Sequence, residues 1–134
     1  MATWAAGSYW TDWHGFTSLN EMVKDYLQKS AYLPIYQNTD LEGTQPAGPM
    51  PESTLPGPSI QGDCLARRDI LYSEWAAFID FLMRQFGMEK LEALFKSSRA
   101  EKINTDTIIY PPDYQGIYGS ALNQLEAEWL TIIQ

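Results

Sequence analysis

The sequence has very few of the residues that metal sites and nucleophilic active sites need. Among 134 residues there is one cysteine, Cys64, and one histidine, His14. A single cysteine excludes an internal disulfide, and a catalytic zinc site normally takes three protein ligands, usually with at least two histidines. The sequence contains no HExxH motif and no glycine-rich phosphate loop. We therefore expect no metal ligands, no cofactor and no catalysis by this chain alone.

Basic residues and long apolar runs are also scarce. Lys and Arg number 9 against 17 Asp and Glu, which gives a formal net charge of -8. Binding to a phosphate backbone needs clustered basic side chains, so we expect no nucleic-acid partner. No apolar run approaches the roughly 18 residues of a membrane span, and the N-terminus does not read as a signal peptide. We expect an acidic, soluble chain without membrane insertion; its location stays open, with a secreted or cell-surface parent protein as one alternative.

Aromatic residues are abundant, with five Trp, eight Tyr and five Phe. Hydrophobic residues make up 45% of the chain, enough for a real core. Residues 1–16 are rich in rings, and we expect a short helix or irregular segment that packs on the rest of the domain. Aromatic side chains with a polar edge also line peptide and sugar sites. The candidate binding residues are Trp10, Trp13, His14 and Tyr72.

The apolar residues recur at helical spacing in four segments, which we expect to form one helical domain over residues 1–134. These segments are 17–30, 64–86, 88–97 and 120–134. Ser18 and Glu21 form a capping box at the start of the first segment. The second segment is apolar over so much of its circumference that it belongs at the centre of the domain. Gly87 follows it, where a left-handed C-terminal cap is expected.

Two stretches lack a helical pattern. Residues 34–63 are rich in Pro and Gly and predict a long loop. Residues 98–119 are irregular, and Ile103, Ile108 and Ile109 are expected either to dock on the core or to pair briefly as strand. The predicted fold class is therefore all-α, with about four main helices around the central apolar helix and a long Pro/Gly-rich loop.

Carboxylates are the remaining candidates for catalysis. They are Asp63, Glu74, Asp80, Glu126 and Glu128. Glu74 lies beside Trp75, and desolvation there would raise its pKa; we expect instead a solvated or Arg-paired side chain. A glycosidase would need two carboxyl groups about 5–10 Å apart in an aromatic cleft.

Three motifs occur along the chain in a fixed order. A capped helix over 17–27 leads to L-P-I at 33–35; Y-S-E-W-A-A-F-I-D-F-L at 72–82 is followed by F-G-M-E-K-L at 86–91; and residues 118–129 run from Y-G-S to L-E-A-E-W. In this order the motifs resemble the C-terminal helical half of gluzincin zinc metallopeptidase domains, the peptidase-MA-like group. The likeness covers residues 17–134 apart from the proline-rich loop.

The resemblance implies a zinc site in a part of the protein that precedes this region. In the family an HExxH helix and a W-x-x-E-G helix come first; here residues 4–7 match the second motif only in part, and no Glu lies within 1–20. The zinc ligands therefore do not carry over, and zinc is expected only if the N-terminal half is present. Tyr72 matches a helical Tyr of the family, so the resemblance implies that it is a catalytic candidate that faces the cleft of a complete domain.

Two functions of different classes follow. The first is a non-catalytic C-terminal subdomain that shapes or supports the substrate cleft of a longer metallopeptidase-like protein, with its N-terminal catalytic half as partner. The alternative is a stand-alone protein or peptide interaction module that uses the aromatic N-terminus and the Pro-rich loop. Exposed apolar surface on an isolated half-domain would favour homo-oligomers.

Overall fold

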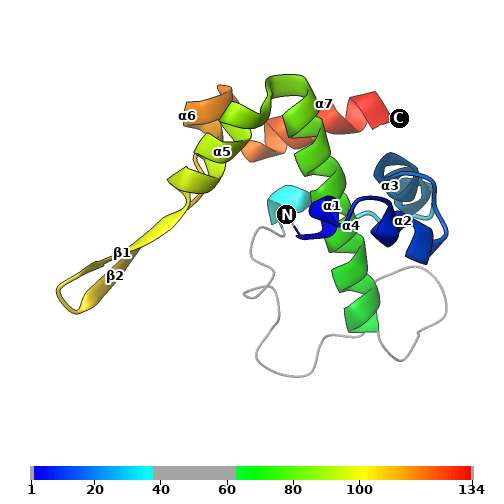
Figure 1. Cartoon of the computed structure of the whole chain (residues 1–134), viewed down its shortest axis with the longest axis horizontal. Helices are drawn as coiled ribbons and strands as arrows, with labels where there is room; N and C mark the ends of the chain where they lie inside the picture. The colour runs from blue at the N-terminus through cyan, green and yellow to red at the C-terminus, as the bar shows by residue number, and fades with distance from the viewer. Residues whose placement is uncertain (1, 38–62, 134) are drawn as a thin grey trace.

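The computed structural model describes residues 2–37 and 63–133, and these are predominantly helical (Figure 1). The elements in chain order are α1 (Ala2–Ala5), α2 (Ser8–His14), α3 (Leu19–Gln28), the 3-10 helix η1 (Ile35–Gln37), α4 (Asp63–Phe86), α5 (Met88–Ser97), β1 (Arg99–Ile103), β2 (Asp106–Tyr110), α6 (Tyr114–Tyr118) and α7 (Leu122–Ile133).

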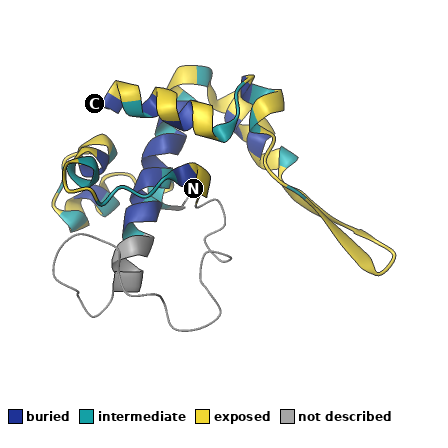
Figure 2. Cartoon of the chain, turned by 180° about the vertical axis from the view of Figure 1, so that it is seen from behind, coloured by how far each residue is buried: buried dark blue, intermediate teal, exposed yellow. Residues whose placement is uncertain are grey.

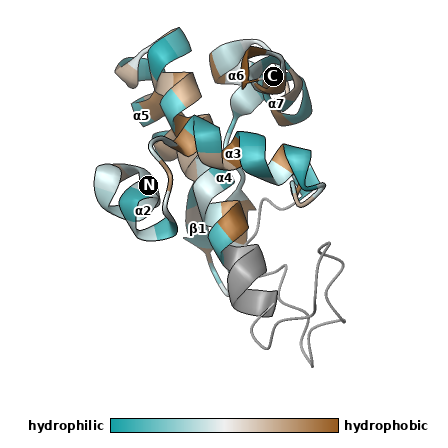
Figure 3. Ribbon diagram, turned by 90° about the vertical axis from the view of Figure 1, so that its right-hand side faces the viewer, coloured by the Kyte–Doolittle hydropathy of each residue, from teal (hydrophilic) through white to brown (hydrophobic). Residues whose placement is uncertain are grey.

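The long helix α4 is the centre of the arrangement. Helices α1, α3, α5, α7 and η1 all contact it, and Figures 1 and 3 show α2 and α3 beside its middle, with α5, α6 and α7 gathered at its C-terminal end. Its side chains Ala77, Phe78 and Leu82 are almost completely buried. A helix that is apolar on several sides is stable only when other elements cover those sides, and that is its position here.

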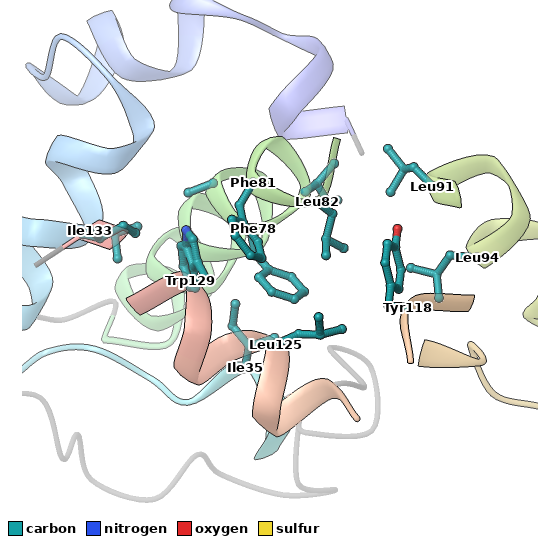
Figure 4. Packing of buried hydrophobic residues seen from close by; sticks show 13 residues of the cluster. Ile35, Phe78, Phe81, Leu82, Leu91, Leu94, Tyr118, Leu125, Trp129 and Ile133 are labelled. Carbon is teal, nitrogen blue, oxygen red and sulfur yellow. The ribbon is translucent and has the colours of Figure 1, made fainter. Parts of the chain in front are cut away.

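The core lies between α4 and α7 (Figure 4). The rings of Phe78 and Trp129 meet edge to face, with centroids 5.5 Å apart, and Leu125 of α7 and Ile35 of η1 belong to the same buried cluster. Aromatic pairs in this geometry add about 0.5–1.5 kcal/mol beyond the burial of their surface. The core therefore joins residues that are almost a hundred positions apart in the sequence.

Local signals set the ends of two helices. The Ser18 hydroxyl accepts a hydrogen bond from the Glu21 backbone N–H at 3.1 Å, and the Glu21 carboxylate in turn accepts one from the Thr17 N–H at 2.8 Å. Gly87 has the positive φ of 93° that favours glycine, but its ψ of 162° places it outside the left-handed helical region expected of a C-terminal cap. Gly87 is instead the joint between α4 and α5, in a positive-φ conformation that residues with a side chain rarely adopt.

An antiparallel hairpin makes the strict all-α prediction wrong. Strands β1 and β2 pair in a register that sets Glu101 opposite Ile108 and Ile103 opposite Asp106. Asn104 opens the turn with a φ of 57°, a conformation that asparagine tolerates. The hairpin projects from the helical body and is exposed along almost its whole length (Figure 2). Of the two alternatives for the isoleucines of 98–119, pairing as strand is the one observed.

The other expected segments have counterparts of similar extent. The predicted helices at 17–30, 64–86, 88–97 and 120–134 correspond to α3, α4, α5 and α7. The aromatic N-terminal segment forms α1 and α2. Of the predicted Pro/Gly-rich loop, residues 38–62 lie outside the described residues. Among the described helices, none combines the length and apolar character that a membrane crossing requires.

Candidate functional site

The structure brings the four predicted binding residues together. Trp10, Trp13 and His14 lie on α2, and Tyr72 reaches them from α4. The Trp10 ring lies 5.6 Å from the Trp13 ring, 4.5 Å from the His14 ring and 6.3 Å from the Tyr72 ring, measured between centroids. With the neighbouring Tyr9, we call these residues the aromatic surface.

Helix α2 is fixed on α4 through Trp10. The Trp10 Nε1 donates to the Ser73 hydroxyl at 2.9 Å, and this hydroxyl donates to the Asp69 carbonyl at 2.7 Å. The Tyr26 hydroxyl of α3 donates to the same Ser73 oxygen at 3.4 Å. Ser73 is fully buried, and a buried hydroxyl needs partners of this kind. Ser73 therefore holds α2, α3 and α4 in one arrangement.

His14 connects the end of α2 to α4. Its Nδ1 lies 2.8 Å from the Trp10 carbonyl oxygen and its Nε2 lies 3.4 Å from Asp69 Oδ2. Both neighbours are acceptors, so His14 bridges the Trp10 carbonyl of α2 and the Asp69 carboxylate of α4. The Trp13 ring lies edge to face with His14, with centroids 4.9 Å apart. Trp13, His14 and Asp69 thus form a continuous row across the two helices.

The outer part of the aromatic surface is open to solvent. Trp13 is 66% exposed and Tyr9 is 73% exposed, whereas Trp10, His14 and Tyr72 are half-buried. Asp69, at the edge of the row, keeps about a third of its side chain accessible. Large exposed rings next to anchored ones are typical of a contact surface, and the adjoining carboxylate favours a cation beside the rings.

A second polar cluster lies in the core, where two buried glutamates hold the segment that follows α3. Glu74 of α4 accepts the Leu33 N–H at 2.9 Å. Glu126 of α7 accepts the Ile35 N–H at 2.8 Å and the Tyr36 N–H at 2.9 Å. It also accepts the Tyr32 hydroxyl at 2.7 Å. The two carboxyl groups therefore replace the backbone partners that this non-helical segment lacks.

Burial changes the titration of this cluster. Glu74 is 0% exposed, and desolvation, together with the charge of Glu126, raises its pKa to about 9 against the Leu33 hydrogen bond, which lowers it. Its Oε2 has no hydrogen-bond partner within the described residues. Burial and the bond to Glu126 also raise the pKa of Tyr32 far above its usual range. Glu74 is therefore a neutral carboxylic acid at pH 7.

The expectation that Glu74 is solvated or paired with Arg was wrong. The reason is that the segment after α3 covers this face of α4, which no local pattern reveals. Glu126 carried a signal that the sequence reading missed, since it shares the inner helical spacing of Leu122, Trp129 and Ile133. Both glutamates are buried and hold backbone groups, an arrangement that suits structural support better than attack on a substrate.

The other acidic candidates are not brought into this cluster. Asp80 accepts from the Trp4 Nε1 at 3.3 Å and from the Arg84 Nε at 2.7 Å, and Glu128 is exposed on α7. The side chains of Asp63 and Cys64 lie outside the described part of the chain. Within that part, no group of three His, Cys, Asp or Glu side chains is placed to hold a metal ion. The described residues thus do not fit the zinc site of the metallopeptidase family.

Comparison with known proteins gives no relative. No protein-family model, no curated protein and no solved structure matches the chain.

Proposed function

We propose that this chain is a non-catalytic helical domain that binds a protein or peptide partner through the aromatic surface. The observation that carries the proposal is the position of Trp13, which is 66% exposed while its ring packs edge to face against the anchored Trp10 ring, with the 73% exposed Tyr9 on the same helix. Tryptophan and tyrosine dominate the binding energy of protein interfaces, because each covers a large area at a small cost in side-chain entropy.

The support beneath these rings favours binding. Trp10 is held by Ser73 and contacts both Trp13 and Tyr72, and His14 is held by the Trp10 carbonyl and Asp69. A surface that is already ordered loses little freedom when a partner docks, so more of the contact energy appears as affinity. The anchored helix α2 provides such a surface.

The charge of the chain indicates the chemistry of the partner. The net charge of -8 disfavours acidic partners. A Lys or Arg side chain laid over the Trp13 ring gains a cation–π contact. The accessible carboxylate of Asp69 lies nearby, against the same His14 ring that Trp13 contacts. The best-fitting partner is a peptide segment that presents a basic side chain among neutral residues.

A displayed library of random peptides tests this proposal. Peptides are selected on the purified chain, and the Kd of the best one is measured by calorimetry for the wild type, Trp13→Ala and Phe95→Ala. Phe95 is an exposed ring on α5, away from the aromatic surface, so it is the matched control. Loss of Trp13 should weaken binding about tenfold or more, with no change for Phe95→Ala.

The opposite results would overturn the proposal. Equal affinity of wild type and Trp13→Ala would place binding elsewhere, and a library that yields no binder would remove the proposed activity. Selected peptides without enrichment of Lys or Arg would refute the basic character of the partner. Because Trp13 is mostly exposed, its replacement should leave the circular dichroism spectrum unchanged, which separates lost binding from lost folding.

In a second candidate function, the partner is another part of the same protein. In this proposal the chain is the C-terminal supporting subdomain of a metallopeptidase-like protein, and its N-terminal catalytic half covers the aromatic surface. The placement of Tyr72 favours it, because this side chain lies against Trp10 at the aromatic surface and is only half-buried. A coding sequence that supplies HExxH and a Glu-bearing helix before Met1 would support it, and a reading frame without them would rule it out.

A further inference from the structure

The hairpin formed by β1 and β2 presents its strands without cover. Within the described residues the sheet has these two strands alone, and they extend away from the helical body (Figures 1 and 2). Ile109 is 75% exposed, and Ile103 and Ile108 are exposed as well. A two-stranded hairpin is at best marginally stable in water, and independent stability requires three or more strands with a hydrophobic face. The exposed edges therefore favour addition of strands.

The two edges differ in how they are protected. Strand β1 carries Arg99, Glu101 and Lys102 among its five residues, and charged side chains of this kind discourage pairing at an edge. Strand β2 reads Asp-Thr-Ile-Ile-Tyr, with one charge and four residues of high strand propensity. The outer edge of β2 is therefore the one suited to accept another strand.

We propose that β2 pairs antiparallel with β2 of a second copy, about a two-fold axis at Ile108. In this register Ile108 lies opposite its own counterpart, Thr107 lies opposite Ile109, and Asp106 lies opposite Tyr110. The result is a four-stranded sheet with the order β1-β2-β2-β1. A two-fold interface requires a self-complementary surface, and a strand with an isoleucine at its centre meets that requirement.

Charge favours a second copy as the occupant. The chain carries -8 overall, yet the hairpin is neutral, because Arg99 and Lys102 balance Glu101 and Asp106. Arg99 is already engaged by the Glu101 carboxylate at 2.8 Å and by the Tyr110 ring at 4.3 Å. The hairpin thus has no unbalanced charge that would select a partner of opposite sign, and it meets its own copy without local repulsion.

The geometry also keeps the acidic bodies apart. In antiparallel pairing each hairpin tip lies beside the base of the other, so the helical bodies are at opposite ends of the sheet. A five-residue strand spans about 17 Å, which exceeds the Debye length of about 8 Å at physiological ionic strength. Residual repulsion between the bodies is screened further by salt, so dimerisation should strengthen as salt rises.

Sedimentation of the full chain tests the dimer, independently of the aromatic surface. The wild type should shift from monomer to dimer with concentration, up to about 1 mM, and Trp13→Ala should behave in the same way. Ile108→Lys should weaken association by more than about tenfold, because it sets two like charges opposite each other. Ile132→Lys is the matched control, an exposed isoleucine on α7, and should leave association unchanged. A wild type that stays monomeric, or an Ile108→Lys variant that dimerises equally well, would overturn the proposal.

Cross-linking tests the register with a milder substitution. In a Cys64→Ser background, Ile108→Cys should form an intermolecular disulfide under mild oxidation, because opposite residues of an antiparallel pair have suitable Cα separations. Ile132→Cys should not cross-link above background. Equal cross-linking of the two variants, or none at position 108, would contradict the pairing of β2 with its own copy.

Discussion

Replacement of the buried acid Glu74 by glutamine should remove a pH dependence from the stability of the domain. Glu74 has a pKa of about 9 in the folded chain against an ordinary value of 4.5. Between these values the folded state holds a proton that the unfolded state releases. The contribution of Glu74 to the free energy of unfolding is therefore greatest below pH 4.5 and falls as pH rises toward 9.

The size of the effect follows from the proton alone. Each pH unit above 4.5 lowers the free energy of unfolding by about 1.4 kcal/mol. Through Glu74 the wild type is therefore about 3 kcal/mol less stable at pH 7 than at pH 4.5. Glutamine keeps an oxygen for the Leu33 N–H and carries no titrating proton. Its amide group replaces Oε2, which has no partner among the described residues, so glutamine adds one more unpaired buried hydrogen than the protonated acid, at a cost of about 1–3 kcal/mol at every pH. The free energy of unfolding of Glu74→Gln, relative to that of the wild type, should consequently increase with pH.

Urea unfolding from pH 5 to pH 9, followed by tryptophan fluorescence, measures this difference. Glu128→Gln is the control, since it makes the same substitution at an exposed position, and its free energy of unfolding relative to wild type should hardly change with pH. If the free energies of unfolding of wild type and Glu74→Gln differ by the same amount at every pH, the assignment of Glu74 as a neutral buried acid is refuted.

Three further changes test the core, each by urea unfolding. Glu126→Ala should destabilise the chain by about 3 kcal/mol or more, because it leaves two backbone N–H groups and a hydroxyl without their acceptor; a loss below about 1 kcal/mol would show that water replaces the carboxylate. Phe78→Ala should cost about 3–5 kcal/mol, whereas Phe95→Ala at an exposed site should cost less than about 1 kcal/mol, and equal losses would argue against α4 as the centre of the core. Ser18→Ala should cost about 0.5–2 kcal/mol through the lost cap of α3, and no loss would mean that the cap is not formed in solution.

The helices could be predicted because their signals are local. Periodic apolar residues mark α3, α4, α5 and α7, and Ser18 marks the start of α3 by a side-chain bond that spans three residues. The hairpin is harder to predict from the sequence, because β1 contains Arg, Ala, Glu and Lys, which favour helix over strand. Its strand geometry comes from pairing with the β-branched residues of β2, which is not visible in β1 itself.

The sites depend on contacts between distant segments. The aromatic N-terminus drew attention to Trp10, Trp13 and His14, and the central helix and the family resemblance drew attention to Tyr72. Only the fold shows that Ser73 fixes Trp10 across 63 positions of sequence. The same holds for the buried glutamates, where 41 positions separate Glu74 from the Leu33 N–H that it binds. Sequence alone predicts that a charged residue is solvated, because the distant segment that buries it is known only from the fold.

The central claim, that the aromatic surface binds a peptide, is tested most directly by the indole N–H signals of the five tryptophans. A selected basic peptide is titrated into the isotopically labelled chain and the signals are followed by nuclear magnetic resonance. The account predicts that the Trp10 and Trp13 signals shift with the binding curve while that of Trp129, 1% exposed in the core, stays in place. Saturable binding that leaves Trp10 and Trp13 unshifted would contradict it.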